Sequence, residues 1–126
     1  MEKKVFLTQK GPKAVGPYST AVTFGNTVYM SGMIPVDPAT GNIAPDIESQ
    51  ARQALENVGT VLAEMGLTYQ DVLKTTVFLT DLADFKTVNG IYAEYLGPDY
   101  PARSCVQVAA LPLGVKLEIE IIAGLK

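Results

Sequence analysis

Hydrophobic residues recur at three- and four-residue steps in two segments of the chain, which is the spacing of an amphipathic helix. The first segment begins after Asp46, a residue suited to cap a helix, and ends at Gly66. The second runs from Leu82 to Tyr95 and ends at Gly97-Pro98. Because each segment carries one apolar stripe, we predict two helices that each bury one face.

Shorter segments rich in Val, Ile, Thr and Phe indicate β-strands. Residues 22–24 and 27–30 flank Gly25-Asn26 and predict a hairpin, since Gly and Asn tolerate the positive φ of a tight turn. Further strands are predicted near the N-terminus and at residues 71–80, 103–108 and 115–122. This order of elements predicts an α+β fold in which two helices cover one face of a mixed sheet.

The second face of the sheet is predicted to need a cover as well. In the strand at residues 71–80, alternation assigns Leu73, Val77 and Leu79 to one face, and Val72 and Phe78 to the other. Both faces are therefore partly apolar, while the chain supplies only two helices. We predict that a closed homo-oligomer buries the second face.

Length and composition place the chain among compact globular proteins. Its 126 residues suit a single domain, 1–126, with no internal repeat or linker. No apolar run is long enough to cross a bilayer, so no membrane partner is expected. The N-terminal residues lack the pattern of a secretory signal, and the lone Cys105 suits a reducing compartment. We therefore predict a cytoplasmic protein.

Several kinds of chemistry are excluded by residue counts. The chain has no histidine and one cysteine, which excludes Ser-His-Asp and Cys-His nucleophile systems and leaves no ordinary zinc site. The formal net charge is -3, and the lysines are dispersed apart from a few near the N-terminus. No basic stripe is available to follow a phosphate backbone, so nucleic acid is not an expected partner.

The remaining candidates for chemistry lie on the last two predicted strands. Arg103 and Cys105 share one face of the first, and Glu118 and Glu120 share one face of the second. The connection between these strands is short, so we expect them to pair antiparallel and to bring the arginine and a glutamate into one pocket. An arginine fork matches a carboxylate, and a glutamate can move a proton from water. Together they predict hydrolysis of a small acid.

The residues alone leave other interpretations open. Arg103 could form a structural ion pair with a glutamate. The two glutamates could lie on a solvated or interface-facing strand, and Cys105 could be a small core residue. Tyr18 could pack in a turn formed with Gly16-Pro17. Ser31-Gly32 could cap a strand or present N–H groups to an anion.

A set of motifs that runs in order along nearly the whole chain resembles the RidA family of reactive-intermediate deaminases, also called the YjgF family. The most specific is Pro101-Ala-Arg-Ser-Cys105, followed by the late strand with Glu118 and Glu120. The others are Gly16-Pro-Tyr18, Ser31-Gly-Met-Ile-Pro35, residues 50–58, Lys74-Thr-Thr-Val-Phe78 and Val88-Asn89. The resemblance implies a chorismate-mutase-like fold with a mixed six-stranded sheet, and a homotrimer with active sites between subunits.

The resemblance also implies a reaction. Family members hydrolyse 2-imino acids or their enamine tautomers, such as 2-iminobutanoate and 2-iminopropanoate, to 2-keto acids and ammonia, with no metal or organic cofactor. By analogy Arg103 binds the substrate carboxylate, and Glu118 holds the attacking water and moves its proton. By the same analogy, the pocket is lined by Tyr18, Ser31, Gly32, Asn89 and Cys105. Cys105 contributes its backbone carbonyl. Met33 departs from the glutamine that often follows Ser-Gly in the family.

Three other functions remain as alternatives. The first is a non-catalytic regulatory protein that binds a small carboxylate at Arg103 without activating water. The second is an endoribonuclease or translation inhibitor, against which the missing histidine and basic surface count. The third is a chaperone-like protein that acts through exposed apolar surface.

Overall fold

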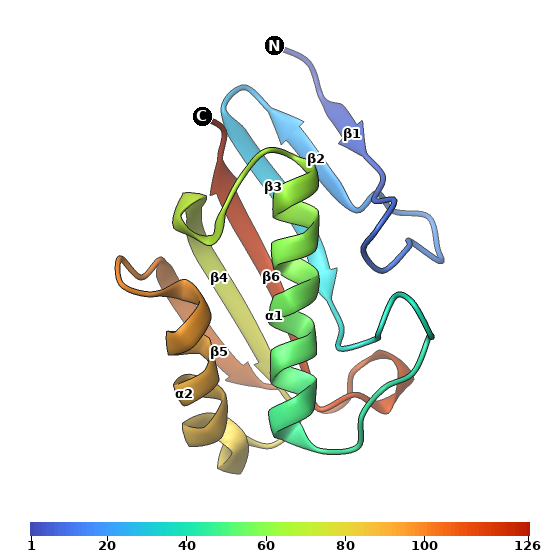
Figure 1. The fold of residues 1–126 in the computed structure, drawn as a ribbon, viewed down its shortest axis with the longest axis vertical. Coiled ribbons are helices and arrows are strands. Elements are labelled where there is room, and N and C mark those ends of the chain that lie inside the picture. The colour runs from blue at the N-terminus through green and yellow to red at the C-terminus, as the bar shows by residue number, and fades with distance from the viewer.

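The computed structural model describes all residues, 1–126, and consists of one β-sheet with two α-helices on one face (Figure 1). The strands are β1 (Lys4–Phe6), β2 (Ala21–Phe24), β3 (Thr27–Met33), β4 (Val72–Leu79), β5 (Ala102–Gln107) and β6 (Leu117–Gly124). The helices are α1 (Ile47–Glu64) and α2 (Phe85–Leu96), with short 3₁₀ turns at Tyr69–Asp71, Leu82–Asp84 and Pro112–Gly114. Neither α-helix is apolar over a length that would cross a membrane.

The sheet has six strands in the order β1-β2-β3-β6-β4-β5. All neighbours pair antiparallel except β4 and β5, which are parallel and are joined by α2. The predicted mixed sheet with two helices on one face is thereby confirmed. The predicted hairpin is β2 and β3, and its turn residue Gly25 has a φ of +62°.

Local signals explain where α1 begins and ends. The side chain of Asp46 accepts a hydrogen bond of 2.9 Å from the backbone N–H of Ser49, which satisfies one free donor of the first turn. Gly66, just beyond the last turn, has a φ of +75°, a conformation that costs glycine little. Leu55, Val58 and Leu62 are almost fully buried, as the predicted apolar stripe requires.

The hydrophobic core lies between the helices and one face of the sheet. In β6 every second side chain, Leu117, Ile119 and Ile121, is buried against the helices. The alternate side chains, Glu118 and Glu120 among them, point to the opposite face, which no helix covers (Figure 1). The sheet therefore has a helix-covered face and an open face.

The predicted pairing of the last two strands is wrong. β4 lies between β5 and β6, and β5 pairs with β4 instead. The segment 108–116 passes over the end of β4, where Thr80 N–H donates to the carbonyl of Lys116. Crossing one strand needs about 10 Å, which a segment of this length spans easily, so a short connection does not force adjacency. A strand, a helix and a strand in succession favour parallel pairing of the two strands.

The predicted faces of the first residues in β4 are also wrong. Val72 is buried and Leu73 is 57% exposed, although Val77 and Leu79 are buried as expected. The pairing of β4 with β6 shifts register between Val72 and Lys74. An extra residue in one strand reverses the alternation on one side of it, which places Leu73 away from the core.

Leu79 and Leu73 offer a matched test of this register shift. Leu79→Ala should lower the free energy of unfolding by about 2–5 kcal/mol, because it opens a cavity at a side chain with no exposed surface. Leu73→Ala should change it by less than about 1 kcal/mol, because that side chain lies largely outside the core. Urea unfolding of both variants measures the difference, and equal losses would contradict the register assigned here.

Candidate functional site: two groups of side chains on opposite faces

Arg103 lies on β5 and is held by one face of α2. Its Cζ atom lies 5.4 Å from the ring centroid of Phe85 and 5.0 Å from that of Tyr92. Its Nη1 donates a 2.7 Å hydrogen bond to Oδ1 of Asn89. Positions 85, 89 and 92 follow the four- and three-residue steps of one helix face, so three side chains of α2 surround the guanidinium together. We call these three residues the arginine cradle.

The guanidinium of Arg103 has no carboxylate partner in the chain. The ion pairs join Arg52 to Glu48 and Glu94, and Lys126 to Asp71. A guanidinium carries five N–H donors, and the bond to Asn89 engages only one nitrogen. The structural ion pair left open by the sequence is therefore absent within the chain, and donors of a half-buried cation are free to bind an anion.

Tyr92 is fixed behind Arg103 by a residue of the neighbouring strand. Its hydroxyl lies 2.6 Å from Oγ1 of Thr75, and both residues are buried, at 5% and 1% exposure. Thr75 is the register partner of Arg103 on β4. Burial raises the pKa of Tyr92, although the bond to Thr75 and the charge of Arg103 act in the opposite direction. The hydroxyl therefore stays protonated at neutral pH.

Cys105 follows on the same face of β5 and packs against the hydrophobic core. Burial raises the pKa of its thiol, and the nearby charge of Arg103 only partly offsets this. A protonated thiol is a poor nucleophile, so the side chain is unsuited to covalent catalysis. The role of its backbone carbonyl stays a prediction.

Glu118 lies on the open face of the sheet, against a glycine. A Cβ atom added at Gly32 would lie 2.0 Å from Oε2 of Glu118 and 2.7 Å from its Cδ. A side chain at position 32 would therefore displace this carboxylate from its place beside β3. Gly32 lies where the pairing of β3 and β6 is irregular, between Met30 and Met33. The residue Met33 itself is buried in the core.

Ser31 fixes the irregular segment of β3. Its backbone N–H donates to the carbonyl of Thr20 at 2.9 Å, and its hydroxyl donates to the carbonyl of Ser19 at 2.7 Å. Both of its donors are used within the chain, which ties the segment beside Glu118 to the two residues just before β2. The hydroxyl oxygen retains the capacity to accept a hydrogen bond.

The carboxyl group of Glu118 is half-buried and pairs with no cation of the chain. Burial raises its pKa above the usual glutamate value, and the negative charge of Glu120 adds to the increase. Glu120 is two residues away on the same side of β6 and is more exposed. A raised pKa suits a group that both accepts and donates a proton near neutral pH.

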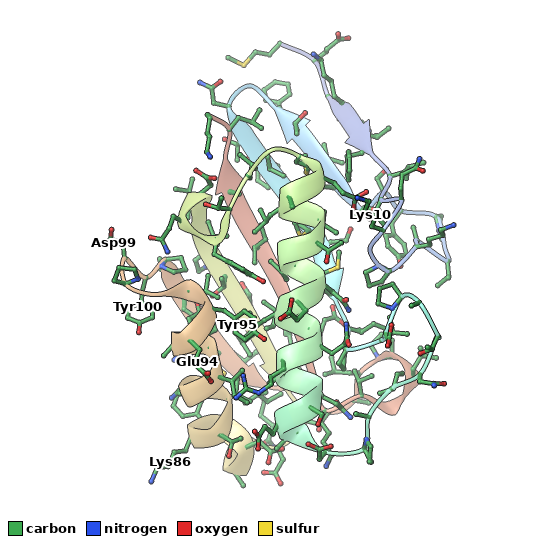
Figure 2. All side chains as sticks on the ribbon, viewed as in Figure 1. Lys10, Lys86, Glu94, Tyr95, Asp99 and Tyr100 are labelled. Atoms are coloured by element: carbon green, nitrogen blue, oxygen red, sulfur yellow. The ribbon has the colours of Figure 1, made fainter.

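Tyr18 lies in the loop before β2 and is half exposed. Together with Gly32 it borders a cavity of about 350 Å³, which Lys10 and Lys13 of the N-terminal loop also line. Figure 2 shows Lys10 in this loop, close to the C-terminal end of α1. Neither Arg103 nor Glu118 lines the cavity. The aromatic ring of Tyr18 is available to a ligand that enters from this side.

The predicted site residues thus form two groups. Gly32 and Ser31 lie beside Glu118, and Tyr18 lines a cavity together with Gly32; we call these four residues the glutamate group. Asn89, Arg103 and Cys105 make up the arginine group. Arg103 points to the helix-covered face and Glu118 to the open face, with β4 between their strands. On β4, Thr75 is the register partner of Arg103 and Phe78 is the register partner of Glu118. Two strand spacings across the sheet and three residues along it imply roughly 14 Å between the Cα atoms of Arg103 and Glu118.

The prediction that strand pairing joins the arginine and the glutamate in one pocket is therefore wrong within a single chain. Phe85 and Tyr92 were not predicted as partners of Arg103, because both fit the apolar stripe of a core helix. Their spacing from Asn89 is the signal that could have identified them. No group of three or more His, Cys, Asp or Glu side chains is arranged to hold a metal ion.

Comparison with known families matches residues 8–125 to the model described as endoribonuclease L-PSP. The chain is 50% identical over 123 residues to the 2-iminobutanoate/2-iminopropanoate deaminase of Salmonella typhimurium, covering 95% of this chain and 96% of that protein. It is 50% identical over 126 residues to the chloroplastic Reactive Intermediate Deaminase A of Arabidopsis thaliana, covering 99% of this chain and 67% of that protein.

Among solved structures, the chain is similar to Escherichia coli TdcF with bound serine. The TM-score is 0.90 at 50% sequence identity, covering 98% of this chain and 99% of that one. At this similarity the two chains share their fold over almost their whole length.

Glu120→Gln tests the electrostatic part of the Glu118 environment. Removing the negative charge of Glu120 should lower the pKa of Glu118, because repulsion between the carboxylates is one of its causes. The pKa should remain above the usual glutamate value, because burial is the larger cause and is retained. NMR titration of the side-chain carboxyl carbons measures this change, with Glu2→Gln as the control. An unchanged pKa of Glu118 would show that the two carboxylates are not coupled.

Proposed function

The chain belongs to the endoribonuclease L-PSP family, and from its relatives and its site we propose that it is a deaminase of reactive 2-imino acids. The family assignment confirms the resemblance to RidA proteins that the motifs indicate. The proposed substrates are small 2-imino acids and their enamine tautomers, such as 2-iminobutanoate and 2-iminopropanoate. The proposed products are 2-keto acids and ammonia.

The observation that carries this proposal is an arginine that is aligned but has no counter-charge. The arginine cradle holds the guanidinium of Arg103 by contacts with two rings and an amide, all of them neutral. An uncompensated, half-buried cation is costly unless an anion binds it. A small carboxylate fits this geometry because it can accept two parallel N–H bonds from one guanidinium. The bound serine in the structure of TdcF supports a ligand of this class.

The proposed reaction needs one further group to handle protons. Water adds through its oxygen to the carbon of the protonated C=N bond, while Glu118 takes a proton from the water. Glu118 then returns the proton to the nitrogen of the resulting carbinolamine. As the C–N bond breaks and ammonia leaves, Glu118 accepts the hydroxyl proton, so that the keto group forms, and this proton passes to the ammonia or to solvent. The raised pKa of Glu118 suits both transfers. A protonated imine is already electrophilic, so orientation and one acid–base group, worth ~10²–10⁴-fold, are sufficient. The mechanism requires neither a metal nor an organic cofactor.

We further propose that the site is completed between subunits of a homotrimer. A small imino acid cannot contact Arg103 and Glu118 of the same chain, because a sheet separates them. The open face also exposes aromatic and aliphatic side chains, among them Tyr29 and Val106, that a second copy would cover. Pairing the arginine group of one subunit with the glutamate group of its neighbour satisfies both requirements. A cytoplasmic location belongs to the same proposal.

The alternatives account for fewer features of the site. The family description names an endoribonuclease, but this chain combines a net charge of -3 with the absence of histidine. A regulatory protein that only binds carboxylates would use Arg103 and leave the raised pKa of Glu118 without a role. Chaperone-like activity would require neither group. Catalysis uses both.

Substitution of the two central residues tests the proposed function. Arg103→Ala should lower kcat/KM for 2-iminobutanoate by about 100-fold or more, because the carboxylate loses its paired donors. Glu118→Gln should lower kcat by about 10²–10⁴-fold and change KM much less, because it removes the proton carrier. The assay follows 2-oxobutanoate formation from imine generated by a threonine dehydratase, above the spontaneous rate.

Arg52→Ala is the matched control for the arginine substitution, because Arg52 is an exposed arginine that pairs with glutamates. It should keep wild-type turnover. If the wild-type protein does not accelerate imine hydrolysis, or if Arg103→Ala behaves like Arg52→Ala, the proposed function is wrong.

A further inference from the structure

We infer that Tyr92 is a positioning residue for Arg103, and that its aromatic ring sets the orientation in which the guanidinium meets a substrate carboxylate. The inference rests on the proposed function and deepens it. It concerns a residue that acts through Arg103 and that lies in the apolar stripe of a helix.

The ring of Tyr92 is the closer of the two that contact the cation. Arg103 Cζ lies 5.0 Å from its centroid, compared with 5.4 Å for Phe85, and both distances are within the range of a cation–π contact. Phe85 is 38% exposed and has no polar group to fix its ring, whereas Tyr92 is 5% exposed. Tyr92 therefore gives the guanidinium its more rigid support.

The hydroxyl of Tyr92 explains this rigidity. It shares a buried hydrogen bond of 2.6 Å with Thr75, and no buried polar side-chain atom of the chain lacks a partner. Thr75 pairs with Arg103 across the β4–β5 ladder. The paired strands β4 and β5 thus carry both Arg103 and Thr75, the residue that holds the Tyr92 ring against Arg103. The ring cannot swing away from Arg103 without leaving two buried hydroxyl groups unpaired.

A fixed orientation matters because arginine binds a carboxylate best through two parallel N–H bonds. Asn89 accepts from Nη1 and so limits rotation of the guanidinium in its plane. The ring of Tyr92 limits tilting of that plane. Together the two contacts leave the remaining donors aligned for an anion that arrives from outside the cradle.

The test compares variants of two tyrosines on the same helix. Tyr92→Leu removes the ring, Tyr92→Phe keeps the ring without its hydroxyl, and Tyr95→Leu is the matched control. The Tyr95 hydroxyl donates to Glu56 of α1, and its ring is not one of the two that make cation–π contacts with Arg103. Figure 2 shows Tyr95 between α2 and α1. Each variant is examined by the NMR signal of the Arg103 Nε–H group and by steady-state kinetics with 2-iminobutanoate. Arg52, the other arginine of the chain, is the internal reference for the NMR signal in the Tyr92 variants; Tyr95→Leu is compared with the wild-type spectrum, because Tyr95 lies beside Arg52.

We expect Tyr92→Leu to move the Arg103 Nε–H signal, because a ring current is lost, and to leave the Arg52 signal in place. We expect KM to rise roughly 2- to 30-fold, the range that corresponds to loss of one cation–π contact, with kcat within about threefold. Tyr92→Phe should raise KM less than Tyr92→Leu does, because the ring remains while the hydroxyl that anchors it is lost. Tyr95→Leu should change neither the Arg103 signal nor KM.

Three results would overturn the inference: an unchanged Arg103 signal in Tyr92→Leu, a loss confined to kcat, or a Tyr92→Phe protein as impaired as Tyr92→Leu. The NMR signal is read without substrate, so it remains informative if Tyr92→Leu is weakly active. Failure of the proposed function would appear differently, as absence of imine hydrolysis in the wild-type protein whatever the Arg103 signal does.

Discussion

The alternation of side chains across one sheet, with β4 between β5 and β6, is the constraint on which the proposed site depends. It directs Arg103 toward the helices and Glu118 toward the open face. Each face also provides the contacts that hold its residue in place. The helix-covered face provides two rings and an amide around the guanidinium, and the open face provides a glycine against which the carboxylate lies. One chain therefore carries both chemical groups but does not bring them together.

Both groups are also left without a neutralising partner inside the chain, and this links their geometry to function. A structural arginine would be expected to pair with a carboxylate, and a structural glutamate with a cation. The chain instead places its ion pairs elsewhere, on Arg52 and Lys126. The cation remains ready for a substrate carboxylate. The carboxyl group gains a raised pKa from burial and from Glu120, which suits proton transfer.

The sequence predicted those features that depend on local signals. The caps and apolar stripes of the helices, the Gly25-Asn26 turn and the alternation in β6 are all encoded within a few neighbouring residues. The order of the strands depends on contacts between distant segments, and there the predicted pairing of β5 with β6 failed. The shifted register near Leu73 failed for a related reason, since a bulge has no strong local signature in this strand. Phe85 and Tyr92 were missed because an aromatic ring in an apolar stripe suits both a core and a cation.

Mixed oligomers test most directly whether the arginine of one chain acts with the glutamate of another. Arg103→Ala and Glu118→Gln subunits, each inactive alone, are unfolded and refolded together in equal amounts. Sites shared between neighbouring subunits predict recovery of about one quarter of wild-type activity. A double variant refolded with wild type should also give about one quarter, whereas sites within single chains would give about one half. No recovery in the first mixture and one half in the second would contradict the account.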